Sequence, residues 1–373
     1  SPLDRSGLDS PLDRSGLDSP LDRSGLDSPL DSDALAELVA RRYGLDTVRL
    51  ERVPIGQGAI NYRATSSTGP LFVKRYPPQA DLAAEARAIG LSETARAGGI
   101  PAAAIVPALD GAWIDRSASA AVSVWAWVEG RTVTDRLGPA RYAAVGRTLG
   151  EIHALFAGLP ESRGPAERSW SWRRVSIAAL DGALDRLLAI VRQRKAAGSL
   201  DAFDAAALVS VPERKRQLGR IPALLAGLPE LGSQVLHGDY TFVNLLFRDD
   251  AICAVLDFRP PEPFLRSYDL GRIAFHPNTV ALDPQWLAIA ATVVEAYVAA
   301  NPTVPAADVA ACGRVALVQL AKSLYGIEQH YLEPGLLQDD LDAFWTLRHA
   351  AVGVLLDHLD EVEAMLVGLA ARR

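Results

Sequence analysis

Three polar side chains that could handle a proton or a hard metal ion lie within one short stretch of this chain. They are Asp239, Asn244 and Asp257, and two apolar, strand-like segments separate them. A loop that runs into a short β-hairpin, with Asp249 and Asp250 near its turn, would return Asp257 to the side of the other two. Phosphoryl transfer requires these residue types, because it depends on positioning, on neutralisation of charge by Mg²⁺ and on a carboxylate that orients the attacking hydroxyl.

This chemistry assigns a role to each of the three residues. Asp239 fits the carboxylate that orients and deprotonates the acceptor hydroxyl, and it is our candidate catalytic residue. Asn244 and Asp257 supply the hard oxygen ligands that Mg²⁺ prefers, and they are our candidate metal ligands. The chain follows the order of the protein-kinase catalytic segment, Asp, four residues, Asn and then a later Asp-Phe, with His-Gly-Asp in place of His-Arg-Asp.

At residues 237–258 the chain resembles the aminoglycoside phosphotransferase and choline kinase family, whose members are kinase-like enzymes that phosphorylate small molecules. The resemblance extends over roughly residues 48–347. It implies an α+β, protein-kinase-like fold of two lobes: a small lobe with a five-stranded antiparallel sheet and one long helix, and a mostly helical lobe that carries the catalytic hairpin. It also implies an ATP-dependent kinase that uses Mg²⁺ and acts on a hydroxyl of a small molecule, with GTP left open as the donor.

The nucleotide side of the site is predicted from a glycine-rich turn and a lysine. Gly56 and Gly58 lie between two predicted strands and precede Asn61, and glycines there let backbone amides approach phosphate oxygens. The resemblance implies that Lys74, on the third predicted strand, contacts the α- and β-phosphates and that Glu85, on the next helix, holds it in place. A solvated strand lysine and a surface glutamate are the alternative interpretation.

A segment rich in tryptophan occupies the predicted junction of the lobes. By resemblance, the backbone of Ala126 and Val128 would hydrogen-bond the adenine, and Trp125 or Trp127 would supply apolar walls. The alternative interpretation is that both tryptophans pack in the core.

The residues that bind the acceptor are predicted from their side-chain types alone. Glu262 lies in a segment, Arg-Pro-Pro-Glu-Pro, that replaces the Gly-Asp-Pro usual in the family. Glu328, His330 and Tyr331 combine acidic, imidazole and aromatic groups at one helix end, and we expect them to contribute to an acceptor pocket.

Two further residues are expected to support the site without reacting. His237 should brace the catalytic loop by hydrogen bonding, and Asp269 should cap a helix and fix the loop. His153, on an apolar helix, is interpreted as a satisfied core histidine.

Two observations favour different acceptors. Residues 301–373 hold ten acidic and five basic side chains, and a negative substrate lobe favours a cationic acceptor such as an aminoglycoside, another amino-bearing antibiotic or an amino sugar. Residues 145–153 and 170–172 instead resemble bacterial homoserine kinases of the same superfamily, which favours a metabolic acceptor such as homoserine, choline or thiamine. Our preferred prediction is the amino-bearing acceptor and hence a resistance-type kinase. A catalytically idle, nucleotide-binding protein is the alternative of another class, although such proteins usually lack one of the residues that are all present here.

Composition narrows the class of protein. The chain has 373 residues and a net charge of -7, and residues 1–36 account for -5 of that charge, with eight Asp against three Arg. The remainder is close to neutral, which argues against nucleic acid as the main partner. Cys253 and Cys312 are the only cysteines, and no run of about twenty apolar residues lacks charges, so we expect a protein of the reducing cytoplasm without a membrane span. The oligomeric state is not predicted.

The elements that position these residues follow from hydrophobic periodicity. Residues 1–32, which begin with three identical copies of Ser-Pro-Leu-Asp-Arg-Ser-Gly-Leu-Asp, are predicted to be a disordered tail, with a docking arm as the alternative. We assign residues 33–128 to a nucleotide-binding lobe and residues 129–373 to a catalytic and acceptor-binding lobe. Strands are predicted at residues 48–55, 61–66, 70–76, 103–107 and 121–127. Helices are predicted at residues 33–42, 81–97, 139–156, 177–194, 202–225, 267–275, 284–300, 306–331 and 337–371.

Overall fold

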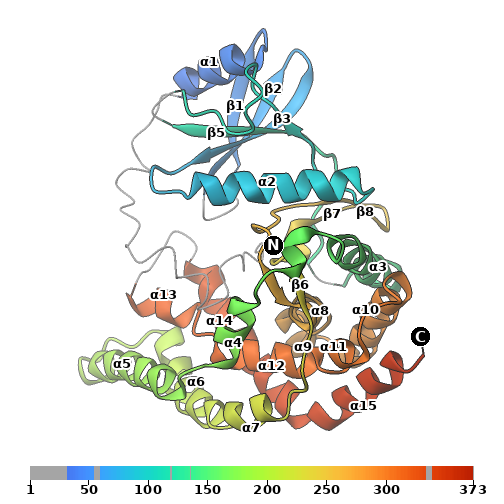
Figure 1. Ribbon diagram of the computed structural model, residues 1–373. Coiled ribbons are helices and arrows are strands. Elements are labelled where there is room, and N and C mark those ends of the chain that lie inside the picture. The colour runs from blue at the N-terminus through green and yellow to red at the C-terminus, as the bar shows by residue number, and fades with distance from the viewer. Residues whose placement is uncertain (1–31, 54–58, 118–119, 135, 333–337, 373) are drawn as a thin grey trace.

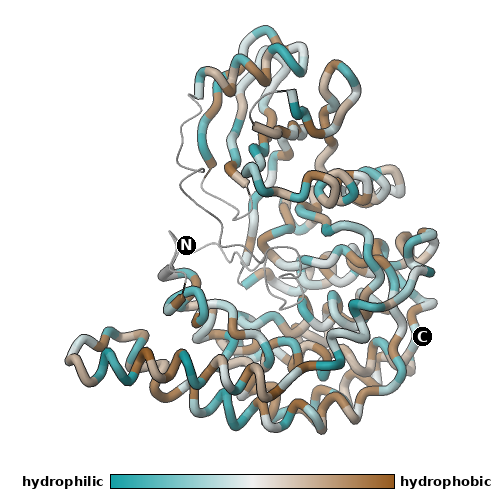
Figure 2. Tube along the Cα trace, turned by 60° about the vertical axis from the view of Figure 1, so that its left-hand side comes forward, coloured by the Kyte–Doolittle hydropathy of each residue, from teal (hydrophilic) through white to brown (hydrophobic). Residues whose placement is uncertain are grey.

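The computed structural model describes residues 32–53, 59–117, 120–134, 136–332 and 338–372. The predicted tail, up to residue 31, and the glycines Gly56 and Gly58 lie outside the described residues. Two lobes are stacked on each other, a β-sheet with its two helices above and a group of helices below (Figure 1, Figure 2). The predicted α+β architecture of two lobes is therefore present.

The small lobe is a five-stranded antiparallel sheet whose strands run in the order β1-β2-β3-β5-β4. Its elements are α1 (Ser32–Tyr43), β1 (Val48–Val53), β2 (Ile60–Ser66), β3 (Gly69–Tyr76), α2 (Leu82–Ala97), β4 (Ile105–Val106) and β5 (Ala121–Ala126). Helix α2 lies between the sheet and the helical lobe (Figure 1). All five predicted strands are present, although β4 is shorter than predicted.

Alternation along β3 decides which side chain faces the other lobe. Val73 is fully buried in the apolar cluster that joins the sheet to α1. Successive side chains of a strand point to opposite faces, so Lys74 and Tyr76 lie on the other face of the sheet. Tyr76 packs there against α2. Lys74 is thereby directed toward α2 and the helical lobe.

The predicted catalytic hairpin is present at the start of the helical lobe. β7 (Leu245–Arg248) pairs with β8 (Ala251–Val255), and the two strands are antiparallel. Asp249 and Asp250 form the two-residue turn between them, and Asp249 adopts a left-handed φ of 54°. The hairpin returns the chain to the side of the loop that precedes it.

The rest of the large lobe is mainly helical, and its helices bury one continuous apolar core. Its helices are α3 (Pro139–Phe156), α4 (Glu167–Arg173), α5 (Ile177–Ala196), α6 (Ala202–Leu218), α7 (Ile221–Ala226), α8 (Arg266–Ala274), α9 (Pro277–Leu282), α10 (Trp286–Ala300), α11 (Ala306–Ala310), α12 (Cys312–Lys322), α13 (Ile327–Leu332), α14 (Gln338–Asp357) and α15 (Leu359–Ala370). Short strands β6 (Ser233–Val235) and β9 (Pro263–Leu265) pair with each other, and 3₁₀ turns occupy Pro160–Arg163 and Phe242–Asn244. Across the part of the chain that the structure describes, no helix has both the length and the apolar character needed to cross a membrane.

Three long helices predicted from periodicity are broken in the structure. The predicted helix 202–225 divides into α6 and α7, the predicted helix 306–331 into α11, α12 and α13, and the predicted helix 337–371 into α14 and α15. Gly326 has a left-handed φ of 97° immediately before α13, a conformation that does not continue a helix. Each new helix still buries at least one apolar side chain, so the apolar periodicity continues across the breaks and predicts helices that are too long. Helices α4 and α9 were not predicted.

Two glycines on α3 allow this helix to pack closely against α10. A Cβ at Gly146 would lie 2.0 Å from the carbonyl oxygen of Val293, and a Cβ at Gly150 would lie 2.6 Å from that of Tyr297. The two glycines are four residues apart and share one helix face. The segment that resembles homoserine kinases therefore has a packing function, and it brings Nδ1 of His153 within 2.8 Å of the Tyr297 hydroxyl.

Candidate active site

The loop that carries Asp239 depends on the glycine immediately before it. Gly238 has a φ of 84°, in the left-handed region, and a Cβ added there would lie 2.8 Å from the Cβ of Arg259. Glycine meets both conditions without strain. The N–H of Gly238 donates to a carboxylate oxygen of Asp269 at 3.0 Å. The backbone next to the buried Asp239 is therefore fixed by its own geometry and by α8.

His237 ties this loop to the end of the hairpin. Its Nδ1 accepts the N–H of Asp239 at 3.1 Å, and its Nε2 donates to the carbonyl oxygen of Leu256, the residue before Asp257, at 2.9 Å. These two partners require a neutral imidazole protonated at Nε2. Burial lowers the pKa of His237, which favours that neutral form at pH 7. The ring therefore braces the loop.

Asp269 anchors the same loop from the first turn of α8. It is fully buried, accepts the N–H of Gly238, and lies 3.6 Å from Nε2 of His153. Burial by itself would raise the pKa of Asp269, but the hydrogen bond and the charge interaction with His153 outweigh it, and the pKa is lowered. An ionised carboxylate at this position strengthens its hydrogen bond to the loop.

The carboxylate of Asp239 is held by two arginines and an amide. Its Oδ1 accepts from Nη2 of Arg272 at 2.6 Å, whereas its Oδ2 lies 3.3 Å from Nδ2 of Asn244 and 3.8 Å from Nη2 of Arg259. Burial would lower the pKa of the Arg272 guanidinium, but a neighbouring tyrosine and Asp239 outweigh it and raise that pKa, so the group is charged. Sequence reasoning missed both arginines. Arg272 could have been found, because it follows Asp269 by three residues and so shares its helix face.

Lys74 joins the two lobes through carboxylates. Its Nζ lies 3.4 Å from Oδ1 of Asp257 and 3.9 Å from Oε2 of Glu85 on α2. Burial would lower the pKa of Lys74, but Asp257 and Glu85 outweigh it and raise the pKa, and Lys74 in turn lowers the pKa of Asp257. Asp257 has a left-handed φ of 56°, which aspartate tolerates better than most residues. Asn61 lies directly opposite Lys74 in the register of β2 and β3, so the structure brings four of the predicted residues together.

Asn244 and Asp257 suit a divalent cation. The backbone carbonyl of Asn244 accepts the N–H of Leu256, which places Asn244 beside the residue that precedes Asp257. Nδ2 of Asn244 is directed at the backbone and side-chain oxygens of Asp239, so the amide oxygen is the atom that can face a ligand. The side chain of Asp257 is 62% exposed and can also offer an oxygen. Amide and carboxylate oxygens are the ligands that Mg²⁺ prefers, so this donor set fits Mg²⁺.

Part of the segment predicted to contact adenine is already hydrogen-bonded within the small lobe. The N–H of Ala126 donates to the carbonyl oxygen of Ala104 at 2.8 Å and is not free for a base. Trp125 is half-buried and packs against the cluster between the sheet and α2. Trp127 lies under an arginine guanidinium of β2, 4.8 Å from its ring centroid, and the half-buried Val128 follows it. Of the two tryptophans, Trp127 is therefore the better candidate for an apolar wall.

The residues predicted for an acceptor pocket make structural contacts. Glu262 lies 4.0 Å from Nη2 of Arg87 on α2 and pairs across the lobes. On α13, which also carries Glu328, Nδ1 of His330 lies 2.8 Å from a carboxylate oxygen of Asp342 on α14. The contacts described for Glu262 and His330 are thus with other elements and not with the catalytic loop.

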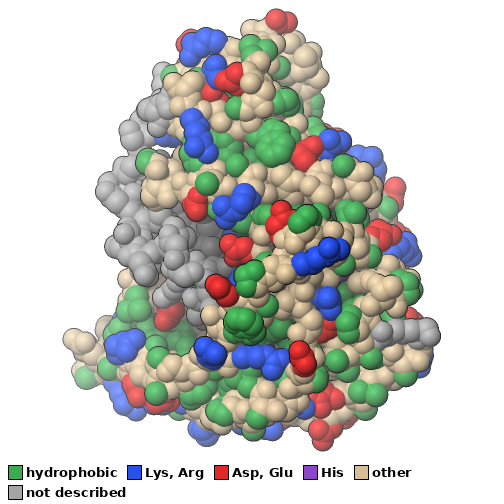
Figure 3. Space-filling view, viewed as in Figure 1, with side chains coloured by type: hydrophobic (Ala, Val, Ile, Leu, Met, Phe, Trp, Pro, Cys, Tyr) green, Lys and Arg blue, Asp and Glu red, His purple; other side chains and the backbone are tan. Residues whose placement is uncertain are grey.

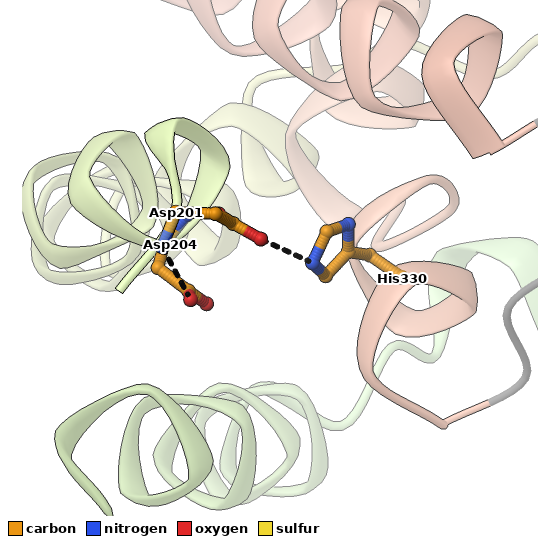
Figure 4. Close-up of side chains that lie close together, drawn as sticks. All are labelled: Asp201, Asp204 and His330. Atoms are coloured by element: carbon orange, nitrogen blue, oxygen red, sulfur yellow. Dashed lines mark hydrogen bonds and ion pairs between the residues drawn. The ribbon is translucent and has the colours of Figure 1, made fainter. Parts of the chain in front are cut away.

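Two aspartates at the start of α6 meet His330 and resemble a metal site in residue type (Figure 4). Asp201 lies 4.0 Å from Nε2 of His330, and Asp201 and Asp204 form a capping box. Asp204, however, lies 3.2 Å from Nη1 of Arg194 and accepts the hydroxyl of Tyr331 at 2.8 Å. A guanidinium already supplies the positive charge that a metal would bring. This cluster therefore ties α13 to α6.

Residues 51–306 match the sequence model of the phosphotransferase enzyme family. No curated protein matches the chain. Among solved structures, an aminoglycoside phosphotransferase from Alicyclobacillus acidocaldarius subsp. acidocaldarius DSM 446 is 19% identical with a TM-score of 0.56, over 85% of this chain and 93% of that chain. Spectinomycin phosphotransferase APH(9)-Ia, in complex with ADP and spectinomycin, is 15% identical with a TM-score of 0.55, over 92% and 98%. A microcompartment-associated aminopropanol kinase is 15% identical with a TM-score of 0.54, over 88% and 98%. These likenesses confirm the predicted fold class.

Proposed function

We propose, on the premise that this chain belongs to the phosphotransferase enzyme family, that it transfers the γ-phosphoryl group of ATP to a small molecule with Mg²⁺ as cofactor. Family membership makes the chain a small-molecule phosphotransferase that acts on a hydroxyl group. The proposal adds the identity of the donor, ATP, and of the metal, Mg²⁺. One observation supports this addition. Lys74 of the small lobe meets Asp257 of the hairpin at 3.4 Å, next to the loop that holds Asp239.

The proposed reaction is a displacement at phosphorus. The acceptor oxygen forms a bond to the γ-phosphorus, the bond to the bridging oxygen breaks with its electron pair leaving on ADP, and the hydroxyl proton goes to Asp239. Mg²⁺, when held by Asn244 and Asp257, neutralises charge on the phosphate oxygens. Arg272 and Asn244 keep the Asp239 carboxylate in one orientation before the acceptor binds, and such preorganisation lowers the barrier.

Lys74 supplies the fixed positive charge for the phosphates in this proposal. Glu85 and Asp257 hold its ammonium between the lobes, and Asn61 lies beside it on β2. Val128 follows the sheet at the place where the adenine would bind. On this basis we assign residues 33–128 to the nucleotide and residues 129–373 to catalysis and the acceptor.

The acceptor predicted from the sequence is an amino-bearing antibiotic or an amino sugar, and the acidic excess of residues 301–373 favoured it. In the structure some of these acids are paired locally, Asp308 with Arg266 at 2.6 Å and Glu363 with Arg314 at 2.7 Å. On the face shown in Figure 3, acidic and basic side chains of the described residues are interspersed. The charge argument is therefore weaker than the count implies, and the amino-bearing acceptor stays a prediction.

Release of ADP, measured with and without acceptors, tests the proposed function. The acceptor panel contains aminoglycosides, amino sugars, choline and homoserine, and both ATP and GTP serve as donors. We expect at least one acceptor class to stimulate ADP release. A general base contributes about 10²–10⁴ in rate, so Asp239→Asn should reduce kcat by that factor while ATP binding, measured by calorimetry, is retained. Loss of ATP binding in this variant, or ADP release that no acceptor stimulates, would contradict the proposal.

A further inference from the structure

A small cavity lies between the catalytic loop and helices α8, α12 and α14. Its volume is about 30 Å³, and Thr241 of the loop forms part of its wall. Arg272 connects the cavity to the proposed base, because the guanidinium that lines the cavity also donates to Oδ1 of Asp239 at 2.6 Å. A group bound in the cavity is therefore one side chain away from the carboxylate that would accept the hydroxyl proton.

The lining of this cavity is positively charged and aromatic. Arg272 and Arg348 contribute guanidinium groups, and Tyr268, Phe275 and Phe344 contribute rings. Among the described residues that line the cavity there is no carboxylate. Such a lining favours an anionic group over a cationic one, because charges interact more strongly in a partly buried site than in water.

Two polar side chains of the wall can serve a ligand. Thr241 is 2% exposed, and within the described part of the chain its hydroxyl has no hydrogen-bond partner, which costs free energy for a buried polar atom. Arg348 is 4% exposed and donates from Nη1 to the hydroxyl of Ser323 at 2.8 Å. A guanidinium has five N–H donors, so Arg348 can bind a ligand oxygen alongside its protein contacts.

We infer that this cavity is the subsite for the non-reacting end of the acceptor and that it takes a carboxylate. The inference rests on the proposed kinase function and names its acceptor class, a compact hydroxy acid whose hydroxyl faces Asp239 and whose carboxylate faces Arg348 and Thr241. A planar carboxylate matches the fork of a guanidinium. An amino group elsewhere on the acceptor is compatible with this arrangement, because only the end in the cavity meets the arginines.

The size of the cavity agrees with a small end group. A water-sized group needs roughly 10–15 Å³ on this measure of volume. The cavity, at about 30 Å³, therefore accommodates a carboxylate, whereas one ring of an aminoglycoside is much larger.

Matched acceptors isolate the contribution of the carboxylate. L-Homoserine and 3-amino-1-propanol share a hydroxyl and an amino group and differ only in the carboxylate, and the same is true of L-serine and ethanolamine. For each pair, kcat/KM is measured from ADP release with the full chain, and kanamycin serves as a polycationic comparison. We expect at least one acid to exceed its amino alcohol by roughly 10- to 100-fold, the range that a hydrogen bond to a charged group supports.

Variants of the cavity test where that preference originates. Arg348→Gln should remove it mainly through a higher KM for the acid, and Arg348→Lys, which keeps the charge, should restore part of it. Thr241→Val keeps the shape of the side chain and should raise the KM for the acid by roughly 2- to 10-fold. Arg314→Gln is the control, because Arg314 lies on α12 but pairs with Glu363 on α15, and it should leave the preference unchanged. Urea unfolding and ATP binding are measured for every variant, and Thr241→Val decides the question if Arg348→Gln does not fold.

Each result bears on the inference. An acid preference that Arg348→Gln and Thr241→Val reduce, and that Arg314→Gln does not, supports the subsite. Turnover of the amino alcohols or of kanamycin that equals or exceeds that of the acids overturns it, as does an acid preference that survives both cavity variants, and in either case the kinase function stands. If no acceptor stimulates ADP release, or if ATP does not bind, the proposed function fails and the subsite fails with it.

Discussion

Arg272→Ala should slow phosphoryl transfer to every acceptor, because it removes the group that fixes Oδ1 of Asp239. Asp239 is buried at 4% exposure, the Arg272 side chain is 11% exposed, and Nη2 of Arg272 lies 2.6 Å from Oδ1 of Asp239. A hydrogen bond to a charged group contributes about 1.5–3 kcal/mol, and about 1.4 kcal/mol corresponds to a tenfold change in rate. If the full contribution is lost in the transition state, kcat should fall by roughly 10- to 100-fold.

The same substitution changes the electrostatics of a buried carboxylate. Breaking a buried ion pair by removing one partner typically costs about 3–5 kcal/mol of stability. Arg259 and Asn244 still face Oδ2, so the expected decrease in the free energy of unfolding lies at or below the lower end of that range. Arg272→Lys keeps the positive charge next to the carboxylate, so its kcat and its stability should lie closer to those of the wild type.

ADP release, together with urea unfolding, measures both effects. Arg259→Ala is the matched control, because its Nη2 lies 3.8 Å from Oδ2 of Asp239 and its side chain is 32% exposed. An exposed ion pair contributes about 0–1 kcal/mol, so this control should lose less than about fivefold in kcat. A folded Arg272→Ala enzyme with the kcat of the wild type would show that Arg272 does not position Asp239. A change confined to the KM for ATP would place Arg272 on the nucleotide side and refute the reasoning in the same way.

Two further predictions concern stability. Gly238→Ala should lower the free energy of unfolding by about 1–3 kcal/mol, because φ is 84° and the new Cβ would lie 2.8 Å from that of Arg259. Gly353→Ala is the control, because Gly353 is a helical position with open space around it, and this variant should be neutral or more stable. Equal urea unfolding curves for the two variants would contradict this prediction. Lys322 is 2% exposed, and burial lowers its pKa to about 7 from an ordinary value of 10.5. Between these two values the unfolded chain binds one more proton than the folded chain, so the free energy of unfolding should rise with pH by up to about 1.4 kcal/mol per unit, and Lys322→Met should remove that rise. Parallel pH dependences of wild type and Lys322→Met would show that Lys322 is charged in the folded state.

The centre of the site could be predicted because local structure fixes each of its residues. Lys74 lies on a short strand whose alternation decides the face it takes, and Glu85 lies in the first turn of a helix that Asp81 caps. Asp257 lies two residues after a hairpin whose strands are joined by a two-residue turn. These local rules place each residue on its own element, whereas the family resemblance in the order of residue types led us to expect that the residues meet, as Lys74 does with Asp257 at 3.4 Å and Glu85 at 3.9 Å.

The residues that sequence reasoning missed owe their position in the site to the way the helices pack against one another. The chain shows that Arg272 follows Asp269 by one helical turn, but whether that face of α8 meets solvent or the catalytic loop depends on packing against distant helices. The same limit applies to the predicted acceptor residues. His330 and Tyr331 were selected by residue type, and they contact the start of α6 because α13 docks there, an arrangement with no local signature in the sequence.

The charged side chains of residues 301–373 show how a count of charges along the sequence can differ from the arrangement of those charges in space. Residues 301–373 carry an acidic excess, yet the field in a cavity is set by the nearest charges, because Coulomb energy falls with distance and solvent and salt screen what lies further away. Glu363 of that segment is paired with Arg314, whereas Arg348 of the same segment is buried and lines the cavity beside the catalytic loop. The segment expected to make the substrate lobe negative thus contributes a cation to the cavity next to the proposed base. Neutralising several surface acids of this segment together should therefore leave the ratio of acid to amino-alcohol turnover unchanged, whereas Arg348→Gln alone should lower it.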